Sequence, residues 1–448
     1  MTGGILIALL LLGCLWVAAG SWLRTRDPVW YWFLIGYLVC VVRMRWTWRA
    51  FAAQCGLTGQ ATGTRLLMGG YSIQAQAARP PIPKMWIGLP RRDGLTAKIN
   101  LLPGQIPEEF VKRALAMAHA WRVHSVRVSS PERGFVVLRL YHSDPIPGVV
   151  VRNGRVPLPV VDPFRTPDRG MGLTMHVGMV EDGRSWVMDF RAVPHWMITG
   201  ITQSGKSTLL RALFTALAPL PVAVVGLDLK GGMEYVIFTP RLSGLATDKK
   251  EAADLLWEVM AIADDRKAAC RAAGVQSVWD LPVVPFPIVV LVDEVAELYL
   301  QGEPGEKALR DKCASLLLRL AQIGAALGIH LVVSGQRIGS DLGAGVTALR
   351  AQLGGRICHR VADEETAKMT LGDVAPEAVE VALSLTPSQQ GYAVATDSEG
   401  GWLRGRSILT SAEAAGSVAS RYAVMTPDLP GITRPNDSGG GTGGGDQR

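Results

Sequence analysis

Residues 200–207 read G-I-T-Q-S-G-K-S and fit the pattern G-x-x-x-x-G-K-[S/T], in which x is any residue. An apolar strand candidate at residues 195–199 leads into this segment, and a helical pattern at residues 207–217 follows it. Backbone N–H groups of such a loop point inward at a triphosphate, and the positive end of the helix dipole adds to them. The segment therefore predicts a nucleotide-binding loop at the start of a helix. The alternative is a glycine-rich turn before an ordinary helix.

Two side chains of this loop have expected chemical roles. Lys206 is expected to place its ammonium group on the β- and γ-phosphates of ATP, and the Ser207 hydroxyl is expected to ligate Mg²⁺. The nucleotide-binding residues are expected to be Gly200, Ile201, Thr202, Gln203, Ser204, Gly205, Lys206, Ser207 and Thr208.

A second apolar run, I-V-V-L-V from Ile288, ends in the acid pair Asp293 and Glu294. An acid pair at the C-terminal end of a buried strand lies where ligands bind in open α/β sheets. Asp293 is expected to hold Mg²⁺ together with Ser207, and Glu294 is expected to orient and deprotonate the attacking water. The loop and the acid pair together predict an ATP hydrolase. For Glu294 alone, a solvated helix start is the alternative.

The composition permits a large core. The chain has 448 residues, 48% of them apolar, which predicts about two or three units. Of the net charge of +7, the first 190 residues hold 22 Lys and Arg against 11 Asp and Glu. This basic excess predicts binding to anionic lipid or to nucleic acid. The alternative is a solvated basic surface that binds neither. The 6 cysteines show no C-x-x-C spacing, so neither a zinc site nor a disulfide framework is expected.

The N-terminal residues have the composition of a membrane anchor. Residues 3–23 carry no charge, and about 20 apolar residues span a bilayer. A second uncharged run, Val29 to Val42, has tryptophans near both ends, as membrane-interface segments do. Arg43, Arg45 and Arg49 follow it, which favours a cytoplasmic position for the chain beyond. We therefore predict a multi-pass protein of the cell membrane with its ATPase domain in the cytoplasm; a cleaved signal peptide is the alternative for the first run.

Beyond this hairpin the pattern alternates between strands and helices. Residues 45–83 look helical and break at a proline-rich stretch, and a small α/β unit follows. After a second proline-rich stretch, the alternation predicts a doubly wound, mostly parallel sheet of the RecA-like type. Expected elements are strands at 97–101, 123–128, 135–141, 222–228 and 329–334, and helices from Pro107, at 250–273 and at 306–327.

These patterns divide the chain into six segments. They are a membrane hairpin (1–48), a helical connector with a proline-rich linker (49–94), a small α/β domain (95–143), a second proline-rich linker (144–170), an ATPase domain (171–410) and a largely disordered C-terminal tail (411–448).

Three further segments resemble the FtsK/SpoIIIE family of DNA-pumping ATPases over about residues 95 to 400. P-H at 194–195 is similar to the family's entry into the loop, and L-D-L-K-G-G-M-E-Y from Leu227 is similar to its D-x-K-x-x-E element. G-I-H-L-V-V-S-G-Q-R from Gly328 is similar to its G-I-H-L-x-x-x-T-Q-R strand. The resemblance makes Asp228, Lys230 and Glu234 candidates for coupling or subunit contact.

Two further catalytic assignments are expected. The amide of Gln336, at the end of the strand beside the acid pair, can contact both the γ-phosphate and the attacking water; a turn cap is the alternative. The resemblance also implies an arginine that reaches a neighbour's γ-phosphate. Arg337, Arg356 and Arg360 are the candidates, with Arg360 our assignment, and each is alternatively a salt bridge or a DNA phosphate contact.

The chain departs from the family in two respects. Gln203 stands where glycine is usual, which we expect to be tolerated because only its backbone is needed. Nothing after Gly400 is long enough for the winged-helix module of the chromosomal members. The layout instead resembles the family's plasmid-transfer members from conjugative elements of actinomycetes. This resemblance implies a hexameric, membrane-held motor that moves double-stranded DNA, with other transfer proteins as partners. There are two alternatives: a secretion ATPase that moves protein or single-stranded DNA, and a membrane-tethered nucleotide-dependent scaffold.

Overall fold

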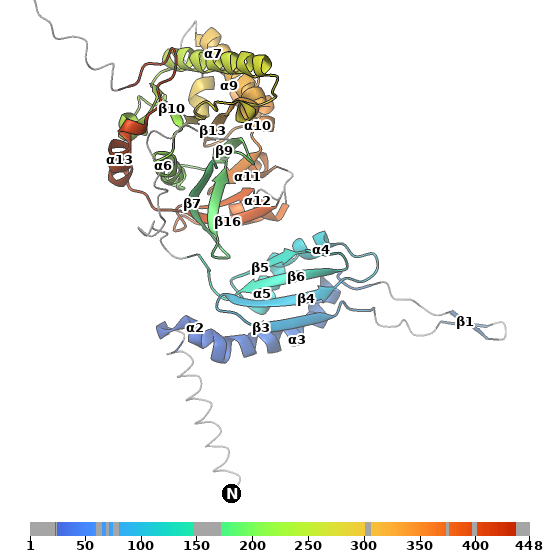
Figure 1. The fold of residues 1–448 in the computed structure, drawn as a ribbon. Coiled ribbons are helices and arrows are strands. Elements are labelled where there is room, and N and C mark those ends of the chain that lie inside the picture. The colour runs from blue at the N-terminus through green and yellow to red at the C-terminus, as the bar shows by residue number, and fades with distance from the viewer. Residues whose placement is uncertain are drawn as a thin grey trace, which may run out of the picture. The chain divides into compact units, whose positions relative to one another are not determined.

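The computed structural model describes residues 23, 25–59, 65–68, 71–74, 80–146, 172–300, 306–372, 376–396 and 401–435. The chain divides into two compact units, the first ending at Pro145 and the second beginning at Ile146. Each unit has its own sheet and its own buried core (Figure 1).

The first unit contains a four-stranded antiparallel sheet in the order β3-β4-β6-β5. Along β6, buried residues alternate with half-buried ones, because one face of the sheet packs on helices. The predicted single helix from Pro107 is two short helices, because the backbone leaves helical geometry at Arg113 (φ −104°, ψ 2°). The bounds are β3 Met85–Pro90, β4 Gly94–Asn100, α4 Pro107–Val111, α5 Ala114–Trp121, β5 Ser125–Ser129 and β6 Phe135–Tyr141.

A long N-terminal helix completes this unit. It consists of α2 (Pro28–Tyr31), a π-helical turn η1 (Trp32–Gly36) and α3 (Tyr37–Gln54). One face is buried in the core of the first unit, and three side chains of that face donate hydrogen bonds to backbone carbonyls of the unit. The buried residues of this face are Trp32, Cys40, Met44, Trp48, Phe51 and Ala52. The donors are the indole N–H groups of Trp32 and Trp48 and the guanidinium of Arg43, and they reach Arg91, Pro83 and Trp121 respectively.

This packing corrects the predicted membrane hairpin. None of the helices in the described part of the chain has the length and apolar character that a membrane crossing requires. The second predicted span, Val29 to Val42, belongs instead to the long helix, whose apolar residues on one side fill a protein core. The first predicted span, residues 3–23, lies outside the described residues except for Leu23.

The region after the long helix also differs from the prediction. Helix was predicted through residues 45–83, whereas α3 ends at Gln54 and a short antiparallel hairpin of β1 (Arg65–Met68) and β2 (Tyr71–Gln74) follows. The small unit therefore begins well before the predicted boundary at residue 95.

The second unit contains a ten-stranded sheet in the order β11-β10-β12-β13-β9-β14-β15-β16-β7-β8. The first six strands in this order run parallel, which confirms the predicted doubly wound core, and the last four extend it in antiparallel fashion. The bounds are β7 Thr174–Val180, β8 Ser185–Asp189, β9 His195–Thr199, β10 Ala223–Leu227, β11 Gly244–Ala246, β12 Ile288–Val292, β13 Ile329–Gly335, β14 Gly355–Cys358, β15 Tyr392–Thr396 and β16 Trp402–Ser407.

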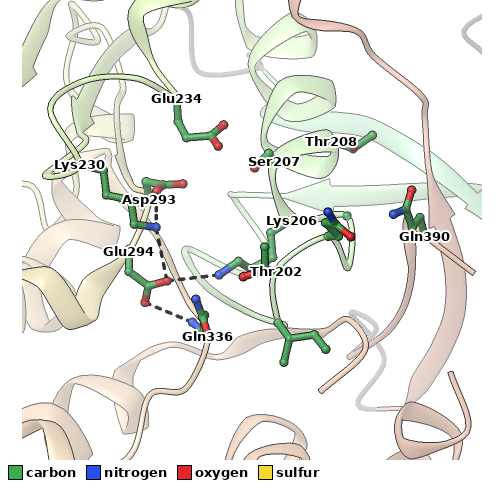
Figure 2. Close-up of a pocket in the computed structure, with 13 residues that line it drawn as sticks. Thr202, Lys206, Ser207, Thr208, Lys230, Glu234, Asp293, Glu294, Gln336 and Gln390 are labelled. Atoms are coloured by element: carbon green, nitrogen blue, oxygen red, sulfur yellow. Dashed lines mark hydrogen bonds and ion pairs between the residues drawn. The ribbon is translucent and has the colours of Figure 1, made fainter. Parts of the chain in front are cut away.

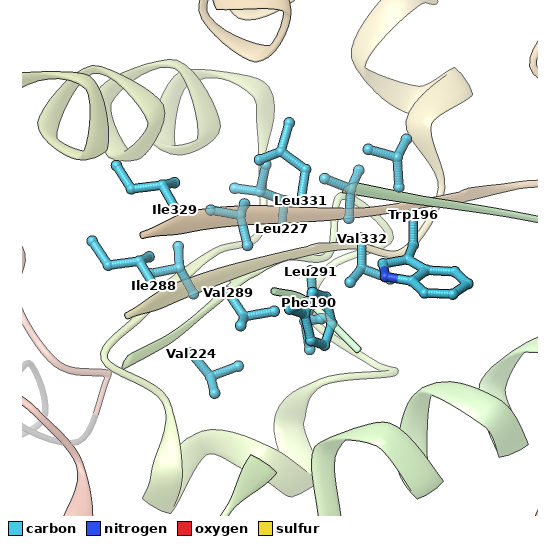
Figure 3. Close-up of a cluster of buried hydrophobic side chains, with 14 of the residues drawn as sticks. Phe190, Trp196, Val224, Leu227, Ile288, Val289, Leu291, Ile329, Leu331 and Val332 are labelled. Carbon is cyan, nitrogen blue, oxygen red and sulfur yellow. The ribbon is translucent and has the colours of Figure 1, made fainter. Parts of the chain in front are cut away.

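The central strands of this sheet are covered on both faces. Every residue of β9, β10, β12 and β13 is buried, the pattern of parallel strands between two helical layers. Their aliphatic side chains form the core drawn in Figure 3, and full burial of each contributes about 1.5–3 kcal/mol. The site lies at the carboxyl ends of these strands, so the core holds its backbone in place.

One of the covering helices, α7, has clear signals at both of its ends. The Asp248 carboxylate accepts the Glu251 N–H at 2.8 Å before α7, and Gly274 ends α7 in the left-handed conformation. The bounds are α6 Lys206–Leu217, α7 Lys249–Ala273, α8 Val295–Tyr299, α9 Glu306–Ile323, α10 Val346–Gln352, α11 Glu364–Leu371, α12 Pro376–Leu383 and α13 Ala412–Arg421. Short 3₁₀ helices occur at Val236–Arg241, Val278–Asp280, Gly324–Leu327, Ser340–Leu342 and Ala423–Met425.

The chain beyond residue 411 differs from the predicted disordered tail. The Ser411 hydroxyl caps α13 by accepting the Ala414 N–H at 3.1 Å, and α13 packs on α6. The chain then continues along the second unit, where the Ser243 hydroxyl donates to the Pro427 carbonyl at 2.8 Å. Residues 436–448 of the predicted tail lie outside the described residues.

The packing of α3 predicts that two substitutions in this helix have very different effects on the free energy of unfolding. Met44 is 0% exposed, so Met44→Ala is expected to lower the free energy of unfolding of the first unit by about 2–5 kcal/mol. Leu38 is 55% exposed, and Leu38→Ala is expected to change it by less than about 0.5 kcal/mol. Urea unfolding followed by tryptophan fluorescence measures the free energy of unfolding of both variants. Equal losses in the two variants would contradict the observed packing of the helix.

Candidate functional site

The nucleotide loop connects β9 to α6 and is tied to the sheet by backbone hydrogen bonds. The Ile201 N–H donates to the Arg360 carbonyl, and the Gly391 N–H donates to the Ser204 carbonyl, both at 3.0 Å. Gly205 precedes α6 with φ +115°, and a Cβ there would lie 2.5 Å from the Gly391 nitrogen. Glycine is therefore required at this position by both conformation and space.

Gln203 adopts the left-handed conformation, with φ +61°. Its side chain is exposed, which agrees with the expectation that its backbone alone is needed. The structure adds a cost, because a non-glycine residue in this conformation is disfavoured by about 1–2 kcal/mol. The glycine that is usual in the FtsK/SpoIIIE pattern would avoid that cost.

The acid pair lies at the end of β12, next to the nucleotide loop. Asp293 and Glu294 are 6% and 7% exposed. Glu294 Oε2 lies 3.4 Å from Lys206 Nζ, and Glu294 Oε1 accepts the backbone N–H of Gln336 at 3.2 Å (Figure 2). The Ser334 hydroxyl donates to the Asp293 carbonyl. Parallel pairing of β12 with β13 and of β13 with β9 places these three strand ends at one edge of the sheet.

A second lysine also reaches the acid pair. Lys230 Nζ lies 3.5 Å from Asp293 Oδ2 and 3.9 Å from Glu294 Oε2 (Figure 2). It is held there by its loop, since the Asp228 carboxylate accepts the backbone N–H groups of Lys230, Glu234 and Tyr235. The segment from Asp228 to Glu234 therefore forms one wall of the site.

Burial and charge act in opposite directions on the ionisable groups of the site. Burial raises the pKa of Asp293, and the neighbouring ammonium of Lys230 lowers it in part. Burial lowers the pKa of Lys206, and the Glu294 carboxylate opposes that shift. The ionised form of Asp293 in this buried position is therefore favoured by the two lysines beside it, Lys230 and Lys206.

These residues line a cavity of about 400 Å³. Its lining residues are Ile201, Thr202, Gln203, Gly205, Lys206, Ser207, Thr208, Lys230, Glu234, Asp293, Glu294, Gln336 and Gln390. Of the predicted site residues, Gly200, Ser204 and Arg360 do not line it. Sequence reasoning missed Gln390, which lies in the turn before β15 and is brought to the loop by the Gly391 hydrogen bond; no local sequence signal marks it.

The three candidate arginines have different surroundings. Arg356 donates to the carbonyls of Arg350, Met369 and Thr370, so its guanidinium supports its own fold. Arg337 pairs with Glu365 at 2.9 Å on the surface. The Arg360 guanidinium has no hydrogen bond or ion pair with any described residue, and its backbone supports the nucleotide loop.

The donor set at the cavity suits Mg²⁺ bound together with a nucleotide. Ser207 and Asp293 supply one hydroxyl and one carboxylate facing the cavity (Figure 2). Mg²⁺ in nucleotide sites is held by few protein oxygens, with phosphate and water completing its shell. Accordingly, no cluster of three or more His, Cys, Asp or Glu side chains suited to a metal occurs among the residues that the structure describes. With nucleotide present, Mg²⁺ would offset charge on the phosphate oxygens.

A glycine-bounded loop on a helix N-terminus, its lysine, and an acid pair at the end of β12, which β13 separates from β9, define a P-loop nucleoside triphosphatase. Comparison with known proteins narrows this class. The FtsK/SpoIIIE family model matches residues 159–283 and 279–340, and the model of the actinomycete conjugal transfer protein N-terminal domain matches residues 17–142. The chain belongs to the FtsK/SpoIIIE family, in its group of actinomycete transfer proteins.

Individual relatives agree with this assignment. Transfer protein TraSA of Streptomyces ambofaciens is 38% identical over 392 residues, which cover 84% of this chain and 91% of that protein. A sporulation regulatory protein of Streptomyces azureus is 47% identical over 242 residues, covering 54% of this chain and 80% of that protein. The solved structure of the pCW3 conjugation coupling protein TcpA, in its monomer form with ATPgS, matches with a TM-score of 0.53 at 17% identity, covering 83% of this chain and 97% of that one. At that identity the likeness shows the fold alone.

The conformation of Gln203 predicts how this position responds to substitution. Gln203→Val is expected to weaken ATP binding about tenfold or more, because a β-branched side chain resists the left-handed conformation. Gln203→Gly is expected to bind as tightly as the natural protein or a few-fold better. Titration with a fluorescent ATP analogue measures both, with Gln203→Asn as the control because asparagine tolerates this conformation. Unchanged affinity in the valine variant would contradict the prediction.

Proposed function

We propose that this protein is an ATP-driven motor that moves double-stranded DNA, working as a hexameric ring in conjugal transfer. The observation that carries the proposal is the contact of Glu294 with both Lys206 and the Gln336 backbone. It brings three expected roles together at one edge of the sheet: phosphate binding by Lys206, activation of water by Glu294 and sensing of the γ-phosphate by Gln336. Membership of the FtsK/SpoIIIE family and the likeness to TraSA support DNA as the cargo.

Each site residue has a distinct role in the proposed reaction. Lys206 binds the β- and γ-phosphates, and Ser207 and Asp293 are the side chains that would hold Mg²⁺. Glu294 accepts a proton from the attacking water, and the side chain of Gln336 reports the presence of the γ-phosphate to the loop that follows it. When phosphate draws Lys206 away, Glu294 loses an ion-pair partner and is free to act as the base.

Arg360 is the residue we propose to act on a neighbouring subunit. Its guanidinium has no partner among the described residues, so it can be offered to another copy without loss of internal contacts. Arg356 and Arg337 are already engaged by carbonyls and by Glu365, respectively. An arginine supplied to the γ-phosphate from a neighbour stabilises the charge that develops in the transition state.

The motor proposal predicts ATP hydrolysis that duplex DNA stimulates and that depends on Lys206. Lys206→Ala is expected to abolish turnover, because the phosphates lose their only loop ammonium, whereas Lys267→Ala on the surface of α7 should leave it unchanged. Binding to duplex DNA should weaken steeply with salt and depend little on sequence. The rate of ATP hydrolysis is measured as phosphate release in the presence of duplex DNA, of single-stranded DNA and of no DNA. Equal stimulation by single strands, or none by either, would refute the duplex motor.

The role of Arg360 across a subunit interface is testable by mixing inactive variants. Arg360→Ala is expected to lower kcat by about 10³-fold or more, while Arg337→Ala keeps near-normal turnover. Because Arg360→Ala retains an intact loop and Lys206→Ala retains an intact arginine, mixed rings contain some complete sites. Recovery of activity on mixing the two variants therefore supports the proposal, and no recovery would show that Arg360 acts within its own subunit or not at all.

A further inference from the structure

The N-terminal helix of the first unit presents a second apolar face that no described residue covers. Five residues at intervals of four are between 54% and 85% exposed, on the side away from the buried Met44 and Trp48. They are Trp30, Leu34, Leu38, Val42 and Trp46, with Phe33 and Val39 exposed beside them. We call these seven residues the outer stripe. Soluble proteins rarely expose a continuous apolar surface of this length without a partner.

The π-helical turn Trp32–Gly36 keeps the outer stripe on one side. In a regular α-helix, each step of four residues turns about 40° beyond a full turn, so four steps would rotate the stripe by about 160°. A π turn takes up one extra residue and removes about 100° of that rotation. The stripe from Trp30 to Trp46 therefore drifts by about 60° around the helix instead of about 160°, and the inner residues Trp32 and Met44 share the sheet side for the same reason.

The charges on this helix identify the chemistry of its partner. Pro28 to Gln54 contains no acidic residue and three arginines. Arg43 is turned inward to the Trp121 carbonyl, whereas Arg45 and Arg49 are exposed next to the outer stripe. Tryptophans at both ends of an apolar stripe, with basic residues alongside, are the composition of a helix lying in the interface of an anionic bilayer.

The inner contacts decide how such a helix can meet a bilayer. A spanning helix faces lipid or other membrane segments on all sides, whereas this helix is held to the β-sheet by hydrogen bonds from Trp32 and Trp48. From Trp30 to Trp46 the stripe is about 24 Å long, shorter than the roughly 30 Å hydrocarbon layer.

We propose that the outer stripe is a bilayer-contacting surface that lies parallel to an anionic membrane, with Arg45 and Arg49 at the lipid phosphates. The surface belongs to the first unit, so the proposal goes beyond the motor activity and does not depend on the cargo. It also gives the apolar Val29–Val42 run a second role, with the helix half in protein core and half in lipid. Burial of the stripe and attraction of two arginines both contribute to binding.

The depth of individual positions in the membrane tests the proposal. The full chain, carrying Cys14→Ser and Cys55→Ser, would receive one nitroxide label at a time through Leu34→Cys, Leu38→Cys, Val42→Cys or Trp46→Cys. The cysteines Cys40, Cys270, Cys313 and Cys358 are buried. Leu115→Cys is the matched control, since Leu115 is 60% exposed on α5 of the same unit. Collision of each label with oxygen and with an aqueous nickel chelate is measured after reconstitution into phosphatidylglycerol and phosphatidylcholine vesicles.

A surface-lying helix predicts shielding from nickel at all four positions at one common depth of about 5–10 Å, with position 115 remaining accessible. Depth that changes by about 6 Å between successive positions would mean a span and would overturn the proposal. Full nickel access at the four positions would also overturn it, as would spin–spin broadening without increased oxygen collision, which would mean contact with a second copy.

A charge variant separates headgroup attraction from burial alone. Arg45→Gln with Arg49→Gln is expected to reduce the shielding at position 38 at least about twofold on anionic vesicles. Lys112→Gln with Arg113→Gln, two exposed cations elsewhere on the unit, should leave it unchanged. Equal shielding in both double variants would overturn the assignment of the arginines to lipid phosphates.

Discussion

The carboxylate of Glu294 accepts two contacts on which the arrangement of the site depends. One oxygen faces the Lys206 ammonium at the start of α6, and the other accepts the N–H that follows β13. Because Glu294 itself follows β12, this one side chain joins the ends of three strands. A buried carboxylate that loses its partner costs about 3–5 kcal/mol, so the three strand ends and the loop are held in one register.

The charges of the site favour a shift of Lys206 from the acid pair to the phosphates when a nucleotide binds. Without phosphates, two lysines neutralise two buried acids, and burial opposes the charged form of Asp293 and of Lys206. A triphosphate brings negative charge that competes for Lys206. Lys230 would then be the lysine that remains to offset the negative charge of the acid pair. Its position depends on the hydrogen bonds that the Asp228 carboxylate accepts from the Lys230 loop.

Much of the motor was predictable from sequence, and much of the first unit was not. The loop at residues 200–208, the acid pair and the strand before Gln336 were predicted from local pattern. The structure brings Gln336, the acid pair and every loop residue except Gly200 and Ser204 to one cavity. Gln390 enters the cavity only because β15 lies close to the loop, a contact between distant segments that no local pattern reports. The helix α13 was mistaken for a tail, because its small residues give a weak apolar signal until they pack on α6.

The sequence by itself determined the residue pattern of the site: the G-x-x-x-x-G-K-S loop at residues 200–207, the acid pair at the end of a strand, and strands apolar enough to be buried on both faces. Tertiary structure alone decided the environment of the apolar run at residues 29–42. Hydropathy records that a side chain avoids water and does not record whether protein or lipid replaces it. The π turn and the hydrogen bonds of Trp32 and Trp48 settle that choice, since they place one face of the helix on a β-sheet and leave the other outside.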